Sequence, residues 1–236
     1  MKLHRFFIDP KYISEEKIAI NEEKLVHQMA NVLKFDEGER LILLDNSGFE
    51  YLCEMEGVAK KEILCKMIER RKNLNEPHVK IRLYQSLIKK DGMENVVEKG
   101  VEVGISEFVP ILAEHSEKKG LNMERMEKII KEAAEQSERG ILPKIFEPIA
   151  FEEAISGLKK NSVVFLEKEG ESLNYLLEEM HGQKEINLFV GPEGGWSDKE
   201  MEIAKKMGVK IVSLGLLTLK SETVGIVAAG VLLSGI

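Results

Sequence analysis

The chain has few cysteines and no long apolar run, and each of these absences excludes a class of protein. Only two of its 236 residues are cysteines, Cys53 and Cys65, and they form neither a metal-ligand nor a redox spacing. A disulfide scaffold is therefore implausible, and a reducing cytoplasm is the expected compartment. The N-terminus lacks the apolar stretch of a signal peptide, and the longest apolar run, 224–236, is too short to span a bilayer. We expect no membrane association.

Several common site signatures are also missing. The five histidines show no ligand spacing, so no metal site is expected. No Gly-x-Ser-x-Gly or Cys/His arrangement indicates covalent catalysis. The glycine-rich segment 191–195 matches neither the dinucleotide fingerprint nor the Walker A loop. Dinucleotide enzymes and P-loop NTPases are therefore disfavoured.

The charge balance is acidic overall but uneven. The net charge is −7, with 43% apolar and 32% charged residues, which fits a soluble globular protein. Segment 60–72 departs from this balance, because it is dominated by lysine and arginine. Such a run is most often a solvated edge and otherwise a patch that follows a phosphate backbone.

Two patterns of secondary structure divide the chain. Short strands are expected at 4–8, 40–44, 49–55 and 63–68 around one helix at 22–34, which suggests a small barrel. After the polar, proline-containing segment 73–77, strands and helices alternate. We therefore expect two domains, 1–73 and 74–236.

The second part has the pattern of a mostly parallel sheet covered on both faces. Its strands are expected at 79–87, 107–112, 162–166, 186–190 and 210–214. Its helices are expected at 92–103, 122–138, 151–158, 173–180, from 198, and at 224–236, with 143–149 as a connector.

Two strand–loop–helix segments in this part are the most informative. The first contains Gly191-Pro-Glu-Gly-Gly195, and Ser197 with Glu200 forms a capping-box pattern that predicts a helix from about Asp198. In the second, Gly215 opens the loop and Ser221 is a possible N-cap. Loops at the carboxyl ends of strands are where open α/β sheets bind ligands. The first loop is also richer in glycine than an ordinary turn requires.

Other local features have modest explanations. Small residues at 225, 228, 229 and 230 share helical spacing, which indicates close packing on the sheet or on a second subunit. Lys220 and Glu222 are charges at an apolar boundary and would suit an exposed helix start. Arg139 lies in a last helical turn, where a cation suits the helix dipole.

Taken in order, several motifs match one known family. Over nearly its whole length the chain resembles the bacterial 16S ribosomal RNA (uracil-N3)-methyltransferases of the SPOUT class. The resemblance rests on Arg5-Phe-Phe, His27, Lys34, Asp45-x-x-Gly48, Lys89, Glu135-Gln-Ser-x-Arg139, Gly191-Pro-Glu-Gly-Gly195, Leu214-Gly and Ser221-Glu-Thr223. The Gly-Pro-Glu-Gly-Gly and Glu-Gln-Ser-x-Arg patterns are the most specific of these.

The resemblance implies an architecture that periodicity alone does not predict. Residues 1–73 would form a PUA-like RNA-binding β-barrel. Residues 74–236 would form an α/β SPOUT domain, with a mostly parallel sheet and a deep trefoil knot that holds S-adenosylmethionine. Members of the family are homodimers that act on 16S rRNA of the small ribosomal subunit. The small-residue tail helix would then lie in the knot core or the dimer interface.

The resemblance also implies a reaction and a set of site residues. Uridine N3 must lose a weakly acidic proton, and its anion must be stabilised and aligned with the sulfonium methyl. The expected catalytic residues are Arg139, Lys220 and Glu222, with Glu222 or Glu193 as orienting groups; the proton acceptor is not identified. Arg5, Lys34 and Lys89 are expected to contact RNA. The expected cofactor-binding residues are Leu166, Glu167, Gly191, Pro192, Glu193, Gly194, Gly195, Leu214, Gly215, Leu217, Leu219, Ser221 and Thr223.

The chain departs from the family pattern at three places. Leu216-Leu217 replaces Pro-Arg, Lys220 replaces an arginine, and His115-Ser116 replaces Arg-Ser. A lysine gives up the bidentate fork of an arginine. The departures keep three alternatives open: a catalytically silent RNA-binding or ribosome-assembly factor, a SPOUT methyltransferase with another RNA target, and an enzyme for another nucleotide-like ligand.

Overall fold

The computed structural model describes residues 3–14, 17–59, 61–117, 120–158 and 163–235. Its contacts divide the chain into two compact units. The first unit comprises residues 1–76 and 134–142, and the second comprises 77–133 and 143–236. Residues 134–142 thus pack with the N-terminal part of the chain, a grouping that the sequence did not predict.

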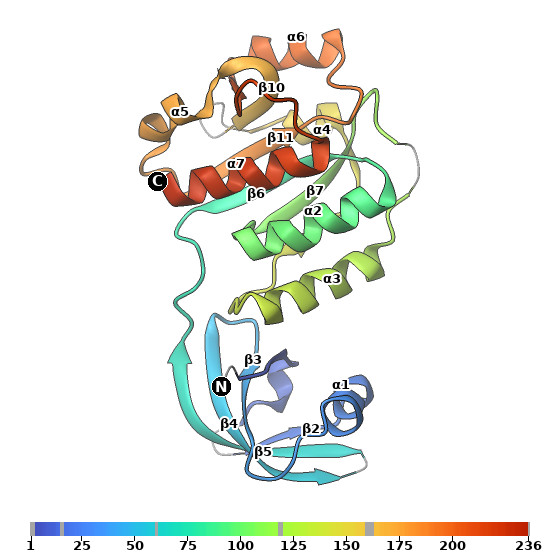
Figure 1. The fold of residues 1–236 in the computed structure, drawn as a ribbon, viewed down its shortest axis with the longest axis vertical. Helices are drawn as coiled ribbons and strands as arrows, with labels where there is room; N and C mark the ends of the chain where they lie inside the picture. Colours follow the sequence, from blue (N-terminus) through green and yellow to red (C-terminus); the bar gives the residue numbers. More distant parts are fainter. Residues whose placement is uncertain (1–2, 15–16, 60, 118–119, 159–162, 236) are drawn as a thin grey trace. The chain divides into compact units, whose positions relative to one another are not determined.

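The first unit contains a five-stranded sheet with the order β1-β3-β4-β5-β2 (Figure 1). The β1–β3 pair is parallel, and the other neighbours are antiparallel. The strand β2 was not predicted, because only Ile18 and Ile20 supply its alternation. The strands are β1 (Arg5–Phe7), β2 (Lys17–Ile20), β3 (Arg40–Leu44), β4 (Phe49–Ala59) and β5 (Glu62–Lys72).

One helical segment packs on the core of this unit. It begins with α1 (Glu23–His27), continues as the π-helical segment η2 (Gln28–Val32) and so replaces the single helix expected at 22–34. Met29 within it is fully buried. A short 3-10 helix, η1 (Pro10–Tyr12), precedes β2.

The second unit contains a seven-stranded sheet whose strand pairs are parallel, as the sequence predicted (Figure 1). The order is β12-β10-β11-β6-β7-β8, and β9 also pairs with β7. The strands β8 and β9 lie in the segment expected to be a connector. The strands are β6 (Lys80–Ser86), β7 (Glu107–Leu112), β8 (Lys144–Ile145), β9 (Ile149–Ala150), β10 (Val163–Ser172), β11 (Glu185–Val190) and β12 (Lys210–Ser213).

Helices cover both faces of this sheet. On one face α7 packs against α2, β6 and β11. On the other, residues of α4 and α6 join an apolar cluster in which the rings of Tyr84 and Phe165 stack on Phe189 with centroids 4.3 and 5.3 Å away. The helices that lie wholly in this unit are α2 (Lys90–Val103), α4 (Phe151–Ile155), α5 (Leu173–Met180), α6 (Asp198–Met207) and α7 (Ser221–Gly235). The helix α3 (Met123–Gln136) has residues in both units.

Two predictions about helices, one about a cap and one about packing, are confirmed. The capping box at α6 is confirmed: Ser197 Oγ accepts from the amide of Glu200, and the Glu200 carboxylate accepts from the amide of Ser197 at 2.8 Å. Close packing of the tail helix is confirmed at Gly225, where an added Cβ would lie 3.1 Å from the side chain of Leu83 and 3.4 Å from that of Val190. Among the described residues, no helix has both the length and the apolar character to cross a bilayer.

Candidate functional site

A cavity of about 850 Å³ lies in the second unit beside the two glycine-containing loops. Parallel strands end there, which is where sheets of this class bind ligands. Its volume suits a small organic molecule. The lining comprises Lys89, Asp91, Gly92, Leu166, Lys168, residues 190–196, residues 212–215, residues 217–222 and Val224.

The first loop needs its glycines for space and for backbone conformation. A Cβ on Gly191 would lie 3.1 Å from the Trp196 indole, and one on Gly194 would lie 3.0 Å from His115 Cβ. Gly195 has φ of +74°, a conformation that side-chain-bearing residues rarely adopt. Because these positions carry no side chains, main-chain groups form much of this wall of the cavity.

Trp196 anchors the end of this loop. Its indole Nε1 donates to the carbonyl oxygen of Leu166 at 3.3 Å, and its ring lies 4.5 Å from that of Phe165. The ring is nearly buried beneath Gly191. Sequence reasoning missed Trp196, although the chain's only tryptophan directly follows the glycine loop.

Two hydrogen bonds join the carboxyl end of β6 to both loops. Gln85 Nε2 donates to Ser221 Oγ at 3.0 Å, and Ser221 Oγ donates to the carbonyl oxygen of Gly191 at 2.6 Å. The carboxyl end of β6, the first residue of α7 and the glycine loop are thereby connected. Sequence reasoning also missed Gln85; the signal was a polar residue within an apolar strand.

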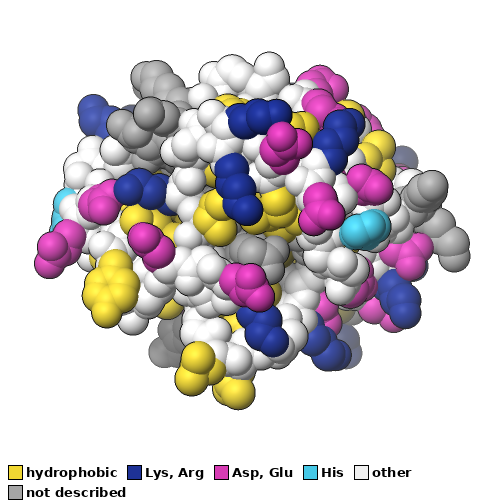
Figure 2. Space-filling view, turned by 90° about the horizontal axis from the view of Figure 1, so that it is seen from above, with side chains coloured by type: hydrophobic (Ala, Val, Ile, Leu, Met, Phe, Trp, Pro, Cys, Tyr) yellow, Lys and Arg dark blue, Asp and Glu magenta, His cyan; other side chains and the backbone are white. Residues whose placement is uncertain are grey.

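Charges of both signs surround the cavity. Lys89, Asp91, Glu193, Lys220 and Glu222 all belong to its lining. Lys220 Nζ lies 3.7 Å from Glu222 Oε1, and the Lys220 side chain is 83% exposed. Such a pair contributes little to stability, so the ammonium group is free to bind a ligand. Figure 2 shows the same mixture on one face, where hydrophobic side chains are bordered by basic and acidic ones.

Most of the residues predicted to bind cofactor line this cavity. Lys220 and Glu222, predicted to be catalytic, also line it, as does Lys89, which was predicted to contact RNA. Thr223 is not part of the lining, and the side chain of Glu167 lies outside the described residues. The lining residues from the predicted set are Leu166, Gly191, Pro192, Glu193, Gly194, Gly195, Leu214, Gly215, Leu217, Leu219 and Ser221.

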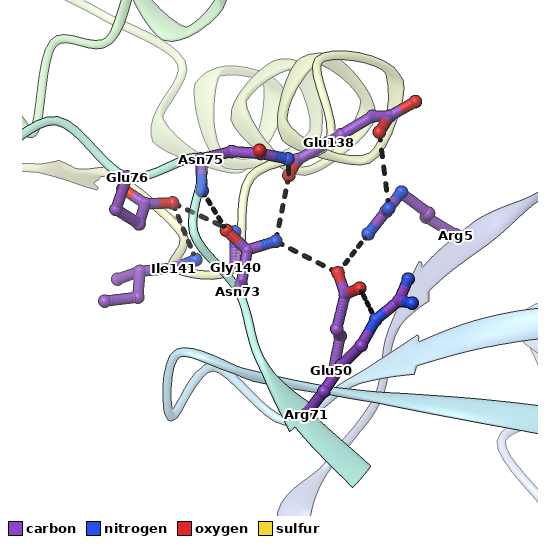
Figure 3. A network of polar contacts seen from close by, with 9 residues as sticks. All are labelled: Arg5, Glu50, Arg71, Asn73, Asn75, Glu76, Glu138, Gly140 and Ile141. Atoms are coloured by element: carbon purple, nitrogen blue, oxygen red, sulfur yellow. Dashed lines mark hydrogen bonds and ion pairs between the residues drawn. The ribbon is translucent and has the colours of Figure 1, made fainter. Parts of the chain in front are cut away.

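Arg139 belongs to the first unit and does not line the cavity of this chain. It is 4% exposed, and its Nη2 donates to Glu76 Oε2 at 2.8 Å. The other oxygen of that carboxylate accepts from the amides of Gly140 and Ile141 at 2.9 and 3.1 Å (Figure 3). Arg139 therefore fixes the segment after α3, and its catalytic role stays a prediction.

Arg5 is also held inside the first unit. Its Nη1 donates to Glu50 Oε2 at 2.6 Å and its Nη2 to Glu138 Oε2 at 3.3 Å, with the side chain 8% exposed (Figure 3). This pairing leaves little of the guanidinium available to RNA. Lys34, in contrast, is exposed and has φ of +54°.

Glu50 is the centre of this polar network. Its carboxylate also accepts from Arg71 Nε at 2.6 Å and from Asn73 Nδ2 at 3.1 Å (Figure 3). Burial opposes its ionisation, but the hydrogen bonds from Arg5, Arg71 and Asn73 outweigh burial and hold the pKa of Glu50 below its usual value. The buried charge is therefore paired and hydrogen-bonded, as a stable buried ion must be.

Both cysteine thiols are free and buried. Burial raises the pKa of both Cys53 and Cys65 to about 12, so these thiols stay protonated at neutral pH. In the part of the chain that the structure describes, no group of three or more His, Cys, Asp or Glu side chains could hold a metal ion.

Comparisons with known proteins point to one family. The profile of the RNA methyltransferase domain matches residues 75–233, and that of the RNA methyltransferase PUA domain matches residues 22–68. The chain is 29% identical over 236 residues to the Bacillus subtilis protein named ribosomal RNA small subunit methyltransferase E, with 94% of this chain and 92% of that protein covered.

Solved structures share the fold. The crystal structure of a ribosomal RNA small subunit methyltransferase E from Neisseria gonorrhoeae bound to S-adenosyl methionine has a TM-score of 0.90 at 24% identity, covering 99% of this chain and 98% of that chain. A putative methyltransferase from Legionella pneumophila, in complex with SAM, has a TM-score of 0.87 at 25% identity, with the same two coverages.

These matches bear on the expectations drawn from the sequence. The PUA-like N-terminal domain and the α/β domain with a parallel sheet are both confirmed. The methyltransferase domain profile alone spans more than half of the chain and includes every residue that lines the cavity. The chain therefore belongs to the RNA methyltransferase family.

Proposed function

We propose that this protein transfers the methyl group of S-adenosylmethionine to N3 of a uridine in the 16S rRNA of the small ribosomal subunit. The observation that carries the proposal is the cavity walled by glycine main chain at the carboxyl ends of parallel strands in an RNA methyltransferase domain. The relative named ribosomal RNA small subunit methyltransferase E, similar over 94% of this chain, supports the ribosomal substrate.

The lining of the cavity fits this cofactor. Gly191, Gly194 and Gly195 leave their main-chain groups open to a planar or polar ligand. Carboxylates on the lining suit the cofactor's ammonium and sulfonium charges, and lysines suit its carboxylate. When bound, S-adenosylmethionine supplies an electrophilic methyl group on sulfur. The SAM-bound structure from Legionella pneumophila, with a TM-score of 0.87 at 25% identity, supports the same assignment.

The residues at the start of α7 would act on the uridine. The Lys220 ammonium neutralises the uracil anion that forms when N3 loses its proton. Glu222 orients Lys220, from which it is separated by 3.7 Å. Glu193, which is exposed at the rim, serves as a second orienting group. Each of these side chains lines the cavity, so each can lie near a base that has left its stack.

The RNA would be held by contacts to its backbone. The N-terminal PUA domain provides Lys34, and the second unit provides Lys89 at the N-terminal end of α2, both with exposed side chains. Arg139 retains its predicted role toward the substrate's negative charge, together with its bond to Glu76. Arg5 supports the RNA-binding domain from within through Glu50 and Glu138.

We also propose that the active form is a cytoplasmic homodimer of SPOUT class with a trefoil-knotted second domain. Residues 224–233 of α7 are all apolar or glycine, yet Val227 is 39% exposed and a Cβ on Gly230 would meet nothing within 4 Å. An apolar helix with an open side is normally covered, and a second copy of the chain would cover it. Light scattering of the purified protein measures its mass in solution, and we expect the mass of two chains.

The reaction is tested by transfer of labelled methyl from S-adenosylmethionine to small ribosomal subunits that lack the modification. Nucleoside mass analysis of the 16S rRNA should recover the label as 3-methyluridine. Subunits that are already methylated are the matched control and should accept no label. Label in another nucleoside would contradict the proposed substrate atom, and no label despite cofactor binding would contradict methyl transfer.

A further inference from the structure

Gln85 occupies a buried position at the carboxyl end of β6. It is 2% exposed and lies between Val190 of β11 and Pro110 of β7 in the register of the sheet. Its side chain reaches Ser221, which is 136 positions later in the sequence and begins α7.

The direction of each hydrogen bond follows from the chemistry of the groups. The carbonyl oxygen of Gly191 can only accept, so the Ser221 hydroxyl, 2.6 Å away, must donate to it. Ser221 Oγ therefore accepts from Gln85, which requires the amide nitrogen, not the amide oxygen, to face it at 3.0 Å. The same nitrogen lies 3.2 Å from the carbonyl oxygen of Ser86, which also can only accept. We call Gln85, Ser221 and Gly191 the relay.

Burial alone does not account for a glutamine here. Among the described residues, Gln85 Oε1 is buried and has no hydrogen-bond partner. An unpartnered buried acceptor is unfavourable, and an apolar side chain of the same size would avoid it. The advantage of glutamine over an apolar residue at this position must therefore come from its amide N–H groups, which donate to Ser221 and to the carbonyl oxygen of Ser86.

The relay joins two adjacent segments of the cavity lining. Gly191 belongs to the glycine loop after β11, and Ser221 begins the helix that carries Glu222. We propose that Gln85 is a positioning residue: by holding Ser221 in the orientation that binds Gly191, it fixes the glycine loop against the start of α7 and so the shape of the cofactor cavity. This inference rests on the proposed function only for the identity of the ligand that fills the cavity.

The test compares the full-length protein with three single variants. Gln85→Met and Gln85→Leu both remove the donors and replace the amide by an apolar side chain of similar volume. Ser86→Ala is the matched control, because its hydroxyl is adjacent, equally buried and unpartnered among the described residues. We expect both Gln85 variants to raise the calorimetric Kd for S-adenosylmethionine about tenfold, which corresponds to about 1.4 kcal/mol. Ser86→Ala should leave the Kd unchanged.

A second readout needs no ligand. Trp196 is the only tryptophan and lies against Gly191, so its emission reports the position of the glycine loop. Both Gln85 variants should shift this emission in the free protein, and Ser86→Ala should not. If the wild-type protein bound no S-adenosylmethionine, the proposed function would fail, and the emission would still decide the inference.

A double-variant comparison separates positioning from a general loss of stability. If Gln85 acts through Ser221, Gln85→Met combined with Ser221→Ala should bind S-adenosylmethionine no more weakly than Ser221→Ala alone. Additive losses would overturn the inference, as would an unchanged Kd and emission in Gln85→Leu. Should Gln85→Met not fold, Gln85→Leu, alone and combined with Ser221→Ala, gives the same comparison.

Discussion

The two units of the molecule hold their polar groups in opposite ways. In the first unit, side chains from distant parts of the chain converge on Glu50 and Glu76, which together accept hydrogen bonds from side chains and amides (Figure 3). In the second unit, main-chain groups of glycines form much of one cavity wall. A hydrogen bond from the Ser221 hydroxyl to the carbonyl oxygen of Gly191 holds this wall in place. The first arrangement depends on which side chains are present and the second on which are absent.

This difference determines what each unit tolerates. Removing one partner from a buried ion network leaves the others unpaired, whereas adding one carbon atom to a glycine wall displaces its neighbours. Mutations that delete side chains should therefore be most harmful in the first unit, and mutations that add them should be most harmful in the second.

The largest expected effect tests the first half of that statement. Glu50→Ala would remove the buried carboxylate that pairs with Arg5 and Arg71 and would leave Arg5 only its bond to Glu138, so it should lower the free energy of unfolding by about 3–5 kcal/mol. Denaturant titration followed by circular dichroism measures the loss. Glu54→Ala is the control, because Glu54 pairs with Arg40 at the surface and should change stability by less than about 1 kcal/mol. If Glu50→Ala and Glu54→Ala lowered the free energy of unfolding equally, burial of the Glu50 network would not be the reason for the loss.

A slightly smaller effect is expected from adding a methyl group in the second unit. A Cβ on Gly170 would lie 2.5 Å from the backbone of Val212, so Gly170→Ala must separate β10 from β12. We expect a loss of about 3 kcal/mol, measured by thermal unfolding. Gly57→Ala, where a Cβ would meet no atom within 4 Å, should be nearly neutral. A neutral Gly170→Ala would mean that the two strands can move apart freely.

Gly195→Ala should have an intermediate effect. Its φ of +74° puts an alanine in the left-handed region, which is about 1–2 kcal/mol less favourable. The added carbon meets no other residue, so the change tests backbone conformation alone. Calorimetry should show weaker binding of S-adenosylmethionine. Binding as tight as that of the wild type would show that the loop does not need this conformation.

A further expectation concerns acid. Because the folded-state pKa of Glu50 is lowered, its contribution to stability is complete above the pKa of an unfolded glutamate, about 4.3, and is lost as the pH falls through the folded-state value. The free energy of unfolding of the wild type should therefore fall more steeply below about pH 4.3 than that of Glu50→Gln. Parallel acid profiles would show that Glu50 is not the titrating group.

The smallest effect on stability is expected at Lys220. Its ammonium is exposed and lies 3.7 Å from Glu222, so Lys220→Ala should change the free energy of unfolding by less than about 0.5 kcal/mol. Methyl transfer to the ribosomal subunit should nevertheless fall at least tenfold, because the uracil anion loses its counter-charge. Lys220→Arg should restore transfer. Full activity in Lys220→Ala would remove this residue from the mechanism.

The sequence predicted the parts of the fold that have strong local signals. The parallel sheet follows from alternating strands and helices, and the cavity follows from Gly191 to Gly195 between a strand and the Ser197 cap. Gln85 and Trp196 escaped prediction because their roles depend on Ser221 and Leu166, which are 136 and 30 positions away. No local pattern encodes such contacts.

The same reason explains why the surroundings of Arg139 were not predicted. Arg139 has a helix-end position that suits many roles, and only its bond to Glu76, 63 positions earlier, identifies its structural task. The π-helical segment at Gln28–Val32 also escaped prediction, because its apolar spacing is the same as that of an α-helix.

The path of the chain through the two units limits how the protein can be dissected. A fragment that ends at Glu76 would lack residues 134–142, and with them Glu135, which accepts from the amide of Phe7 at 2.9 Å, and Glu138, which pairs with Arg5. The N-terminal unit therefore cannot be transferred to another protein, by recombination or cloning, as one continuous segment. Exchange of this unit between proteins would require joining two separate stretches of sequence.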